Sequence, residues 1–243
     1  MGQLTRIGSP RFSASSAGSF VTPLRIATFG LVVALASCNA LAQRHNRDYY
    51  APRLTSDDTQ LFNNVESFHL EPGRQELKSK RFKAALDHAE FMLRYYPNHP
   101  QALDLLSQIC VSWGSNPRCD ADAAFELAIA RRPEASRTYL VYGIHLQRVK
   151  RVDDAVRNYK RAIDLDPGSM NAHYNLGLAY ESQKKYALAN DAAQRAYALG
   201  AQLPGLRDKL KAVNAWRVTV SEPTAPEGRK DLGPVGGIKT EGQ

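Results

Sequence analysis

The sequence predicts an all-α fold in which helical hairpins stack side by side into a solenoid. Two glycines, Gly143 and Gly177, stand 34 residues apart, and the apolar residues around one recur at the same distances around the other. Pro133 and Pro167, which end two successive units, are separated by the same 34 residues. A fixed period of this length is typical of stacked repeats, because a single hairpin cannot bury its apolar face without a neighbour.

Each repeating unit is predicted to contain two amphipathic helices joined by a short turn. In the unit at 136–169 the first helix has one apolar face, formed by Tyr139, Tyr142, Gly143 and Leu146. The second helix has another, formed by Val152, Ala155, Tyr159, Ala162 and Ile163. Both sets follow the spacing of an α-helix, and Pro167 ends the second helix because proline cannot continue it.

These motif residues resemble the tetratricopeptide repeat (TPR) family. One unit carries Tyr174-Asn175-Leu176-Gly177, Tyr180, Ala189 and Ala196, and the other carries Gly143, Ala155, Tyr159, Ala162 and Pro167. The resemblance implies a right-handed superhelical solenoid of TPR hairpins. It also implies a concave groove, lined by the first helix of each unit, that holds a protein or peptide partner.

Two earlier units depart from the pattern. Ser107 stands where glycine is expected, and two extra residues separate it from the helix that follows. Further upstream, Pro72-Gly73 is expected to disturb a first helix. The predicted segments are a lipoprotein-type signal peptide at 1–37, a polar tether at 38–63, a degenerate repeat at 64–99, a repeat with a two-residue insertion at 100–135, repeats at 136–169 and 170–203, a capping helix at 204–216 and a disordered tail at 217–243.

The N-terminal residues predict export. Residues 1–37 contain three arginines and no acid, and Ile26–Ala36 is an apolar run of eleven residues, the length of a signal-peptide core but too short to span a bilayer. Leu35-Ala36-Ser37-Cys38 resembles the bacterial lipobox, in which the signal is cut before Cys38 and its thiol is acylated. Asn39 resembles the residue that directs such lipoproteins to the outer membrane, facing the periplasm. The alternative is cleavage after Ala40-Leu41-Ala42, which gives a soluble periplasmic protein.

The three cysteines fit an oxidising compartment if Cys38 is acylated, since Cys110 and Cys119 then remain as a pair. Both lie beside the two-residue insertion, and we expect a disulfide that clamps the longer turn. The alternative is that Cys110 is a small buried apolar residue and Cys119 a free surface thiol.

Positive charge is modest but unevenly placed. The formal charge is +8, and removal of residues 1–37 with their three arginines leaves +5. No base-reading motif accompanies this charge, so nucleic acid is not an expected partner. Basic residues gather in the turns between paired helices: Lys78, Lys80 and Arg81, then Lys150 and Arg151, then Lys184 and Lys185. We call these residues the basic ridge. It could bind acidic protein segments or anionic head groups, or it could be an ordinary solvated edge.

The TPR resemblance implies which side chains line the groove. They are Gln101, Asp104 and Gln108, then Arg137, Leu140, Val141 and Ile144, then Asn171, Tyr174, Asn175 and Leu178. Within this set, the amide of Asn175 suits a peptide backbone and the guanidinium of Arg137 suits a carboxylate. Tyr174 offers a flat apolar face.

No catalytic or cofactor motif is found. The six histidines lack metal-ligand spacing, and no glycine-rich phosphate loop or nucleophile elbow occurs. The sequence therefore predicts a protein that is not an enzyme and binds no cofactor or metal. We expect a lipid-anchored adaptor of the bacterial envelope. The alternatives are a soluble periplasmic or secreted binding module and a structural protein that forms homo-oligomers.

Overall fold

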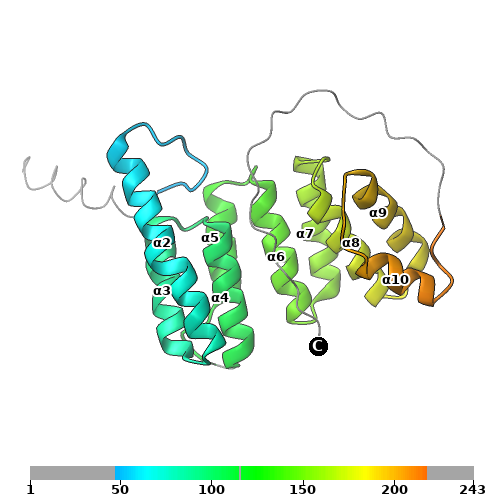
Figure 1. Ribbon diagram of the computed structural model, residues 1–243, viewed down its shortest axis with the longest axis horizontal. Helices are drawn as coiled ribbons and strands as arrows, with labels where there is room; N and C mark the ends of the chain where they lie inside the picture. The colour runs from blue at the N-terminus through cyan, green and yellow to red at the C-terminus, as the bar shows by residue number, and fades with distance from the viewer. Residues whose placement is uncertain (1–46, 115, 218–243) are drawn as a thin grey trace, which may run out of the picture. The chain divides into compact units, whose positions relative to one another are not determined.

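The computed structural model describes residues 47–114 and 116–217, and every regular element within them is an α-helix (Figure 1). The helices are α2 (Ser56–Lys78), α3 (Phe82–Tyr95), α4 (Pro100–Trp113), α5 (Ala121–Arg131), α6 (Ser136–Arg148), α7 (Val152–Leu165), α8 (Met170–Ser182), α9 (Tyr186–Ala198) and α10 (Gly205–Ala212). The predicted fold class, an all-α stack of helical hairpins, is confirmed. The predicted signal peptide, Cys38 and residues 218–243 lie outside the described residues.

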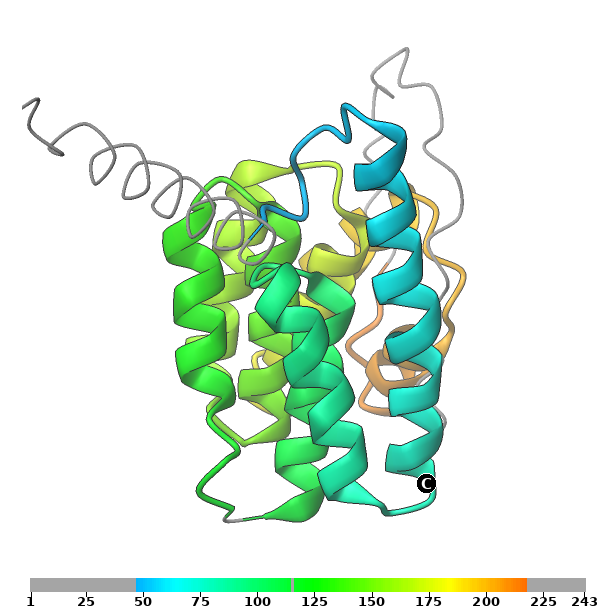
Figure 2. The ribbon, with the colours of Figure 1, turned by 90° about the vertical axis from the view of Figure 1, so that its left-hand side faces the viewer.

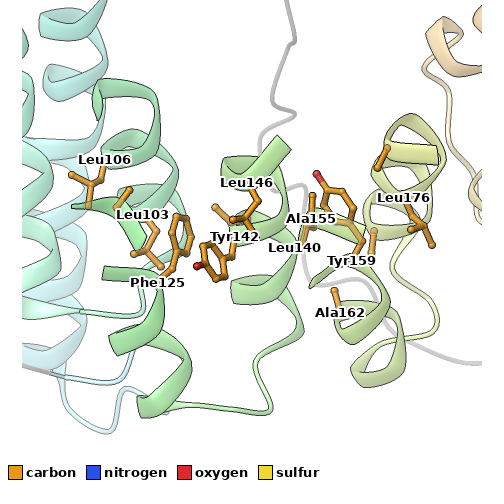
Figure 3. Close-up of a cluster of buried hydrophobic side chains, with 14 of the residues drawn as sticks. Leu103, Leu106, Phe125, Leu140, Tyr142, Leu146, Ala155, Tyr159, Ala162 and Leu176 are labelled. Carbon is orange, nitrogen blue, oxygen red and sulfur yellow. The ribbon is translucent and has the colours of Figure 1, made fainter. Parts of the chain in front are cut away.

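Consecutive helices pair into hairpins, and each hairpin packs against the next. Helix α3 packs on α4, α7 packs on α8, and α10 packs against both α8 and α9. One continuous core runs through the stack. At its centre the ring of Phe125 stacks on Tyr142 with centroids 4.7 Å apart, and Tyr159 lies fully buried further along (Figure 3).

Two repeat glycines allow neighbouring helices to pack closely: Gly143 on α6 faces α7, and Gly177 on α8 faces α10. A Cβ atom at Gly143 would lie 2.4 Å from the ring of Tyr159, and one at Gly177 would lie 2.5 Å from Leu206. Tyr159 cannot move aside easily, because its ring is fully buried and its hydroxyl donates to Gln147 Oε1 at 2.9 Å. Since no side chain fits at these positions, the helix backbones approach closely only with glycine.

The expected disturbance at Pro72-Gly73 is wrong, because α2 runs unbroken through both residues. Proline removes one hydrogen-bond donor from a helix, but Leu70 and Leu77 on either side pack against the core and hold the helix together. Gly73 serves as the glycine of this repeat, since its Cβ would meet Leu105 at 2.8 Å. The prediction treated this residue as a helix breaker, although it is a packing position.

The polar tether predicted at 38–63 is wrong from residue 47 onwards. Residues 56–63 form the first turns of α2, and Thr55 caps this helix by accepting a hydrogen bond from the Asp58 amide at 3.1 Å. Residues 47–55, which we call the strap, lie against the folded domain: the Arg47 amide donates to the Tyr95 carbonyl at 2.6 Å. The strap leaves the N-terminal end of α2 and loops back towards the connection between α3 and α4 (Figure 2). Local composition missed it because its partners lie far along the chain.

The predicted disulfide between Cys110 and Cys119 is not formed in this structure. Both residues are half-buried free thiols. Burial, together with the hydrogen bond to the Cys119 thiol, raises the pKa of Cys110 well above its usual value. The prediction that the two side chains meet at the insertion is nevertheless consistent with their hydrogen bond.

Replacing Gly143 with alanine should destabilise the domain. The added methyl group overpacks the contact with Tyr159, which typically costs about 1–3 kcal/mol, and the better helix propensity of alanine offsets at most about 1 kcal/mol of this. We expect a lower urea midpoint with an unchanged slope. Gly168→Ala is the control, because its Cβ would meet nothing closer than Asp166 at 3.5 Å. Equal midpoints for both variants would show that close approach at Gly143 is unimportant.

Candidate partner-binding surfaces

The predicted groove residues lie on the first helices α4, α6 and α8, but only some of them face solvent. Asn171 is exposed, while Arg137, Ile144 and Asn175 are half-buried. Asn175 donates its amide nitrogen to the Asn171 carbonyl at 2.8 Å, which leaves its side-chain oxygen to accept from a ligand. These four residues form a strip along α6 and α8 that we call the groove strip.

Other predicted groove residues are committed to the fold. Leu140 and Val141 are buried in the core, because α6 packs against helices on both sides. Leu178 is half-buried against the same core. The hydroxyl of Tyr174 accepts a hydrogen bond from the Leu206 amide at 3.2 Å, so it ties α8 to the capping helix α10. The groove prediction is therefore wrong for Leu140 and Val141, which present no surface to a partner.

A buried polar network replaces the missing glycine of the second repeat. Ser107 Oγ lies 3.0 Å from His145 Nδ1 and accepts from Arg148 at 2.9 Å. Arg148 also pairs with Asp104 at 2.7 Å. Gln108 donates to the same carboxylate at 2.8 Å. Asp104 is thus buried and paired, and the prediction that it faces a partner is wrong. The sequence signal that was missed is a histidine and an arginine spaced i, i+3 on α6, opposite the serine.

Burial lowers the pKa of His145, and the nearby Asp122 carboxylate only partly opposes this effect. Its ring packs beside those of Phe125 and Tyr142, at 5.5 and 6.2 Å between centroids. Burial likewise lowers the pKa values of His69, His99 and His173. The folded protein therefore holds these four imidazoles in the neutral form at pH 7.

Folding stability should decrease as the pH falls below about 6.5, the usual pKa of histidine in an unfolded chain. Below that pH the histidines of the unfolded chain bind protons that those of the folded protein do not, so the unfolded state is stabilised relative to the folded one. We expect a lower urea midpoint at pH 5.5 than at pH 7.5. His145→Gln, which keeps a polar side chain but cannot titrate, should reduce this difference. A pH-independent midpoint between these values would contradict the assignment.

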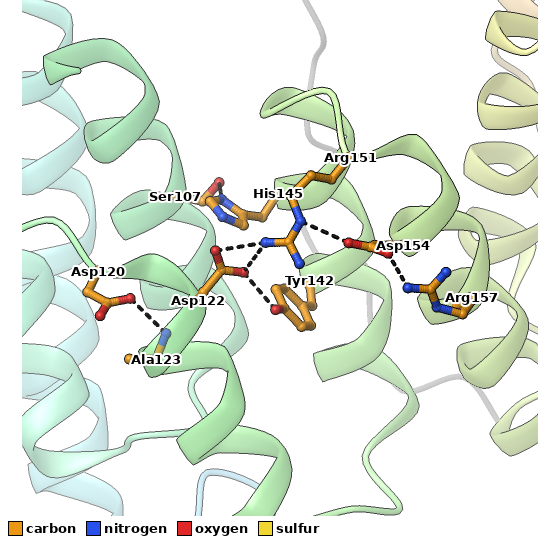
Figure 4. Close-up of polar contacts among 9 residues, drawn as sticks. All are labelled: Ser107, Asp120, Asp122, Ala123, Tyr142, His145, Arg151, Asp154 and Arg157. Carbon is orange, nitrogen blue, oxygen red and sulfur yellow. Dashed lines mark hydrogen bonds and ion pairs between the residues drawn. The ribbon is translucent and has the colours of Figure 1, made fainter. Parts of the chain in front are cut away.

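The basic ridge is less charged than its sequence suggests. Arg151 pairs with Asp122 at 3.0 Å and with Asp154 at 2.8 Å, and the Tyr142 hydroxyl donates to Asp122 at 2.6 Å (Figure 4). Arg81 pairs with Glu76. In contrast, Lys150, Lys184 and Lys185 are exposed and form no ion pair with any described residue. Lys78 and Lys80 are likewise exposed without an ion pair among the described residues, so five lysines carry the free charge of the ridge.

Three of the ridge lysines adopt a backbone conformation that favours glycine. Lys80, Lys150 and Lys184 have φ values of 57°, 67° and 58°. Each follows a first helix in a Schellman turn: the Lys150 amide, for example, donates to the Gln147 carbonyl at 3.1 Å. At the matching positions after α9 and α10 the chain uses Gly200 and Asn214, which tolerate such φ values. Lysine is therefore used in three hairpin turns despite its conformational strain, which favours a role for its charge.

Neither metal binding nor membrane spanning is indicated by the described part of the chain. Within it, no three histidine, cysteine, aspartate or glutamate residues gather in a way that could hold a metal ion. Among the described helices, none combines the length and the apolar character needed to cross a membrane.

The comparisons with known proteins identify the repeat. The family model described as TPR repeat matches residues 150–184, and no curated protein matches the chain. A solved structure of pilF from Pseudomonas aeruginosa is 22% identical, with a TM-score of 0.49, and the match covers 63% of this chain and 70% of that one. TTC0263, a TPR protein of Thermus thermophilus, is 22% identical over 62% of this chain and 84% of that one, with a TM-score of 0.48.

A third solved structure is that of YrrB, which is described as a TPR protein with an unusual peptide-binding site. It is 18% identical over 79% of this chain and 87% of that one, with a TM-score of 0.43. Residues 150–184 contain α7, α8 and the turns at either side. This segment matches the TPR repeat, and the helical hairpins before and after it continue the same architecture.

Proposed function

We propose that this protein is a non-catalytic adaptor that holds a segment of another protein along the groove strip. Proteins built from TPR repeats generally mediate protein–protein interactions and are typically scaffolds without catalysis. The observation that carries the proposal is that α6 has a buried face and an accessible face. Leu140 and Val141 are buried in the core, whereas Arg137 and Ile144 on the same helix remain partly accessible.

The chemistry of the groove strip favours an acidic peptide segment. Arg137 has no ion pair with any described residue, and its guanidinium suits a carboxylate through two parallel hydrogen bonds. The free side-chain oxygen of Asn175 can accept from a peptide amide. Ile144, two turns after Arg137 on α6, supplies apolar contact.

The groove can be tested by crosslinking in cells followed by mass spectrometry. Arg137→Glu should reduce the crosslinks to the partner by at least about tenfold, because it replaces an attractive charge with a repulsive one. The comparison variant is Lys150→Gly with Lys184→Gly, which removes two ridge charges at positions whose φ values suit glycine. This variant should remain folded and keep its partner.

Two outcomes would contradict the groove proposal. Crosslinks lost only in the lysine variant would move the binding surface to the basic ridge, with an acidic partner docking on the turns. Crosslinks found only to a second copy of the chain would favour a homo-oligomer. Circular dichroism of each variant checks that folding is retained.

The proposal extends to location: the adaptor is anchored to the outer membrane through acylated Cys38 and faces the periplasm. It is supported by the lipobox-like residues Leu35-Ala36-Ser37-Cys38 and by Asn39. Because residues 47–63 belong to the folded domain, the segment between anchor and domain is residues 38–46. The alternative remains release after Ala42 as a soluble periplasmic protein.

Cys38→Ala should abolish incorporation of labelled fatty acid and move the protein from the membrane fraction to the soluble fraction. Stable anchoring needs more than one acyl chain, and a lipoprotein-type modification of Cys38 supplies them. Cys119→Ala is the matched control and should leave both readouts unchanged. If the Cys38→Ala variant stays in the membrane fraction, the acyl-anchor proposal is wrong, and the groove proposal is unaffected.

A further inference from the structure

The strap is held to the domain in the way that proteins hold short peptides. Its main chain is fixed at two points: the Arg47 amide donates to the Tyr95 carbonyl at 2.6 Å, and the Tyr49 amide donates to Asn98 Oδ1 at 2.8 Å. Asn98 is fully buried, and its amide nitrogen donates to Asp48 at 2.6 Å. One buried asparagine thus forms hydrogen bonds with both the backbone and an acidic side chain of the strap.

The acidic residue of the strap is recognised by charge as well. Asp48 forms an ion pair with Arg132, which follows the last residue of α5 and lies 84 residues further along the chain. Although burial opposes ionisation, the hydrogen bonds from Asn98 and the Tyr50 amide, together with Arg132, lower the pKa of Asp48. The carboxylate is therefore charged at neutral pH and matched by a fixed cation.

Aromatic contacts complete the site. The ring of Tyr49 packs on His99 at 4.5 Å and on Phe62 at 5.7 Å between centroids. The Arg132 guanidinium lies 5.7 Å from the ring centroid of Tyr50. His99 is fully buried, and its Nε2 lies 3.0 Å from Glu66, which fixes the ring on which Tyr49 rests. The receiving side chains are therefore preorganised by the rest of the domain.

The last four residues of the strap, 52–55, make few contacts with the domain. Pro52, Arg53, Leu54 and Thr55 are exposed, and 84% of the surface of Leu54 is accessible to solvent. Arg53 packs over Phe62 at 3.4 Å from the ring centroid. At the other end of the strap, Arg47 pairs with Asp58 in the first turn of α2, and Tyr49 packs against the buried cluster of Val65, Met92, Tyr96 and Ala102. Release of residues 47–51 breaks these contacts but no hydrogen bond within a helix.

We propose that Phe62, Asn98, His99 and Arg132 form a second peptide-binding site, specific for an acidic residue followed by two aromatic residues, and that Asp48-Tyr49-Tyr50 is its resident ligand. A partner protein with a segment of this type competes with the strap. None of the four receiving residues belongs to the groove strip, but the two sites adjoin, since Arg137 of the strip lies within electrostatic range of Tyr49, Tyr50 and His99. The occupant is inferred from what the site already binds: a carboxylate on Arg132, a peptide amide on Asn98 and a ring on His99.

Competition with a tethered ligand has a quantitative consequence. A strap that is closed in about 99% of molecules weakens the apparent affinity of a partner by about a hundredfold. Short tethers give effective concentrations in the millimolar range, so even modest contacts keep the site closed. Loosening the strap should therefore tighten partner binding rather than weaken it, which is opposite to the effect of damaging an ordinary site.

The test uses the full chain and a fluorescent peptide with the sequence of residues 46–54, followed by fluorescence anisotropy. The release variant carries Asp48→Ala and Tyr49→Ala, which remove the resident ligand and leave the receiving residues intact. We expect the peptide to bind this variant at least about tenfold more tightly than the wild type. A peptide with Asp48→Asn should bind at least about tenfold more weakly than the unmodified peptide.

Receptor variants are made in the release background. Arg132→Gln should abolish binding of the peptide. The matched control is Arg94→Gln, which changes an exposed arginine of α3 and should leave binding unchanged. Asn98→Ala is a second probe, but Asn98 is buried, so its folding is checked by circular dichroism. Equal affinity of the peptide for wild type and release variant, or affinity that ignores Asp48 and Arg132, would overturn the proposal. A wild-type dimer in light scattering that disappears in the release variant would do so too, because it would assign the site to strap exchange between copies.

Discussion

The contact of Gly143 with the ring of Tyr159 is the constraint on which the repeat stack depends. The fully buried ring occupies the space that a side chain at 143 would take. Close approach within a hairpin lets its outer faces meet the next hairpin, so one core extends through the chain. This arrangement also determines the polar surfaces, because stacking buries one face of each first helix and leaves another exposed to solvent.

The second repeat shows what happens when the glycine is absent. Ser107 cannot allow the same approach, and its hydroxyl instead joins His145 and Arg148 in a buried network. A buried polar group must be hydrogen-bonded to be tolerated, and here every partner comes from a neighbouring first helix. The strap reinforces the same region from outside, since Asp48 joins Asn98 before α4 to Arg132 after α5. The irregular repeat thus adds polar contacts to the packing of Leu103, Leu105 and Phe125, which are buried in the common core.

Features set by local spacing could be predicted, and features set by distant partners could not. The repeats at 136–169 and 170–203 were predictable because glycine, alanine and proline recur in register. The same register could have revealed Gly73, which precedes Ala85 by 12 residues as Gly143 precedes Ala155. In contrast, no local pattern pairs Asp48 with Arg132. Among the predicted groove residues, Leu140 and Val141 are buried because α6 has neighbours on both sides.

Helix α10 gives the stack a finished end. Its Leu206 is fully buried and lies over Gly177, where a further hairpin would otherwise dock. Open-ended fibres grow only when a molecule carries two complementary, unlike faces. Because Leu206 of α10 occupies this face, a hairpin of another molecule cannot dock on Gly177 while α10 is in place.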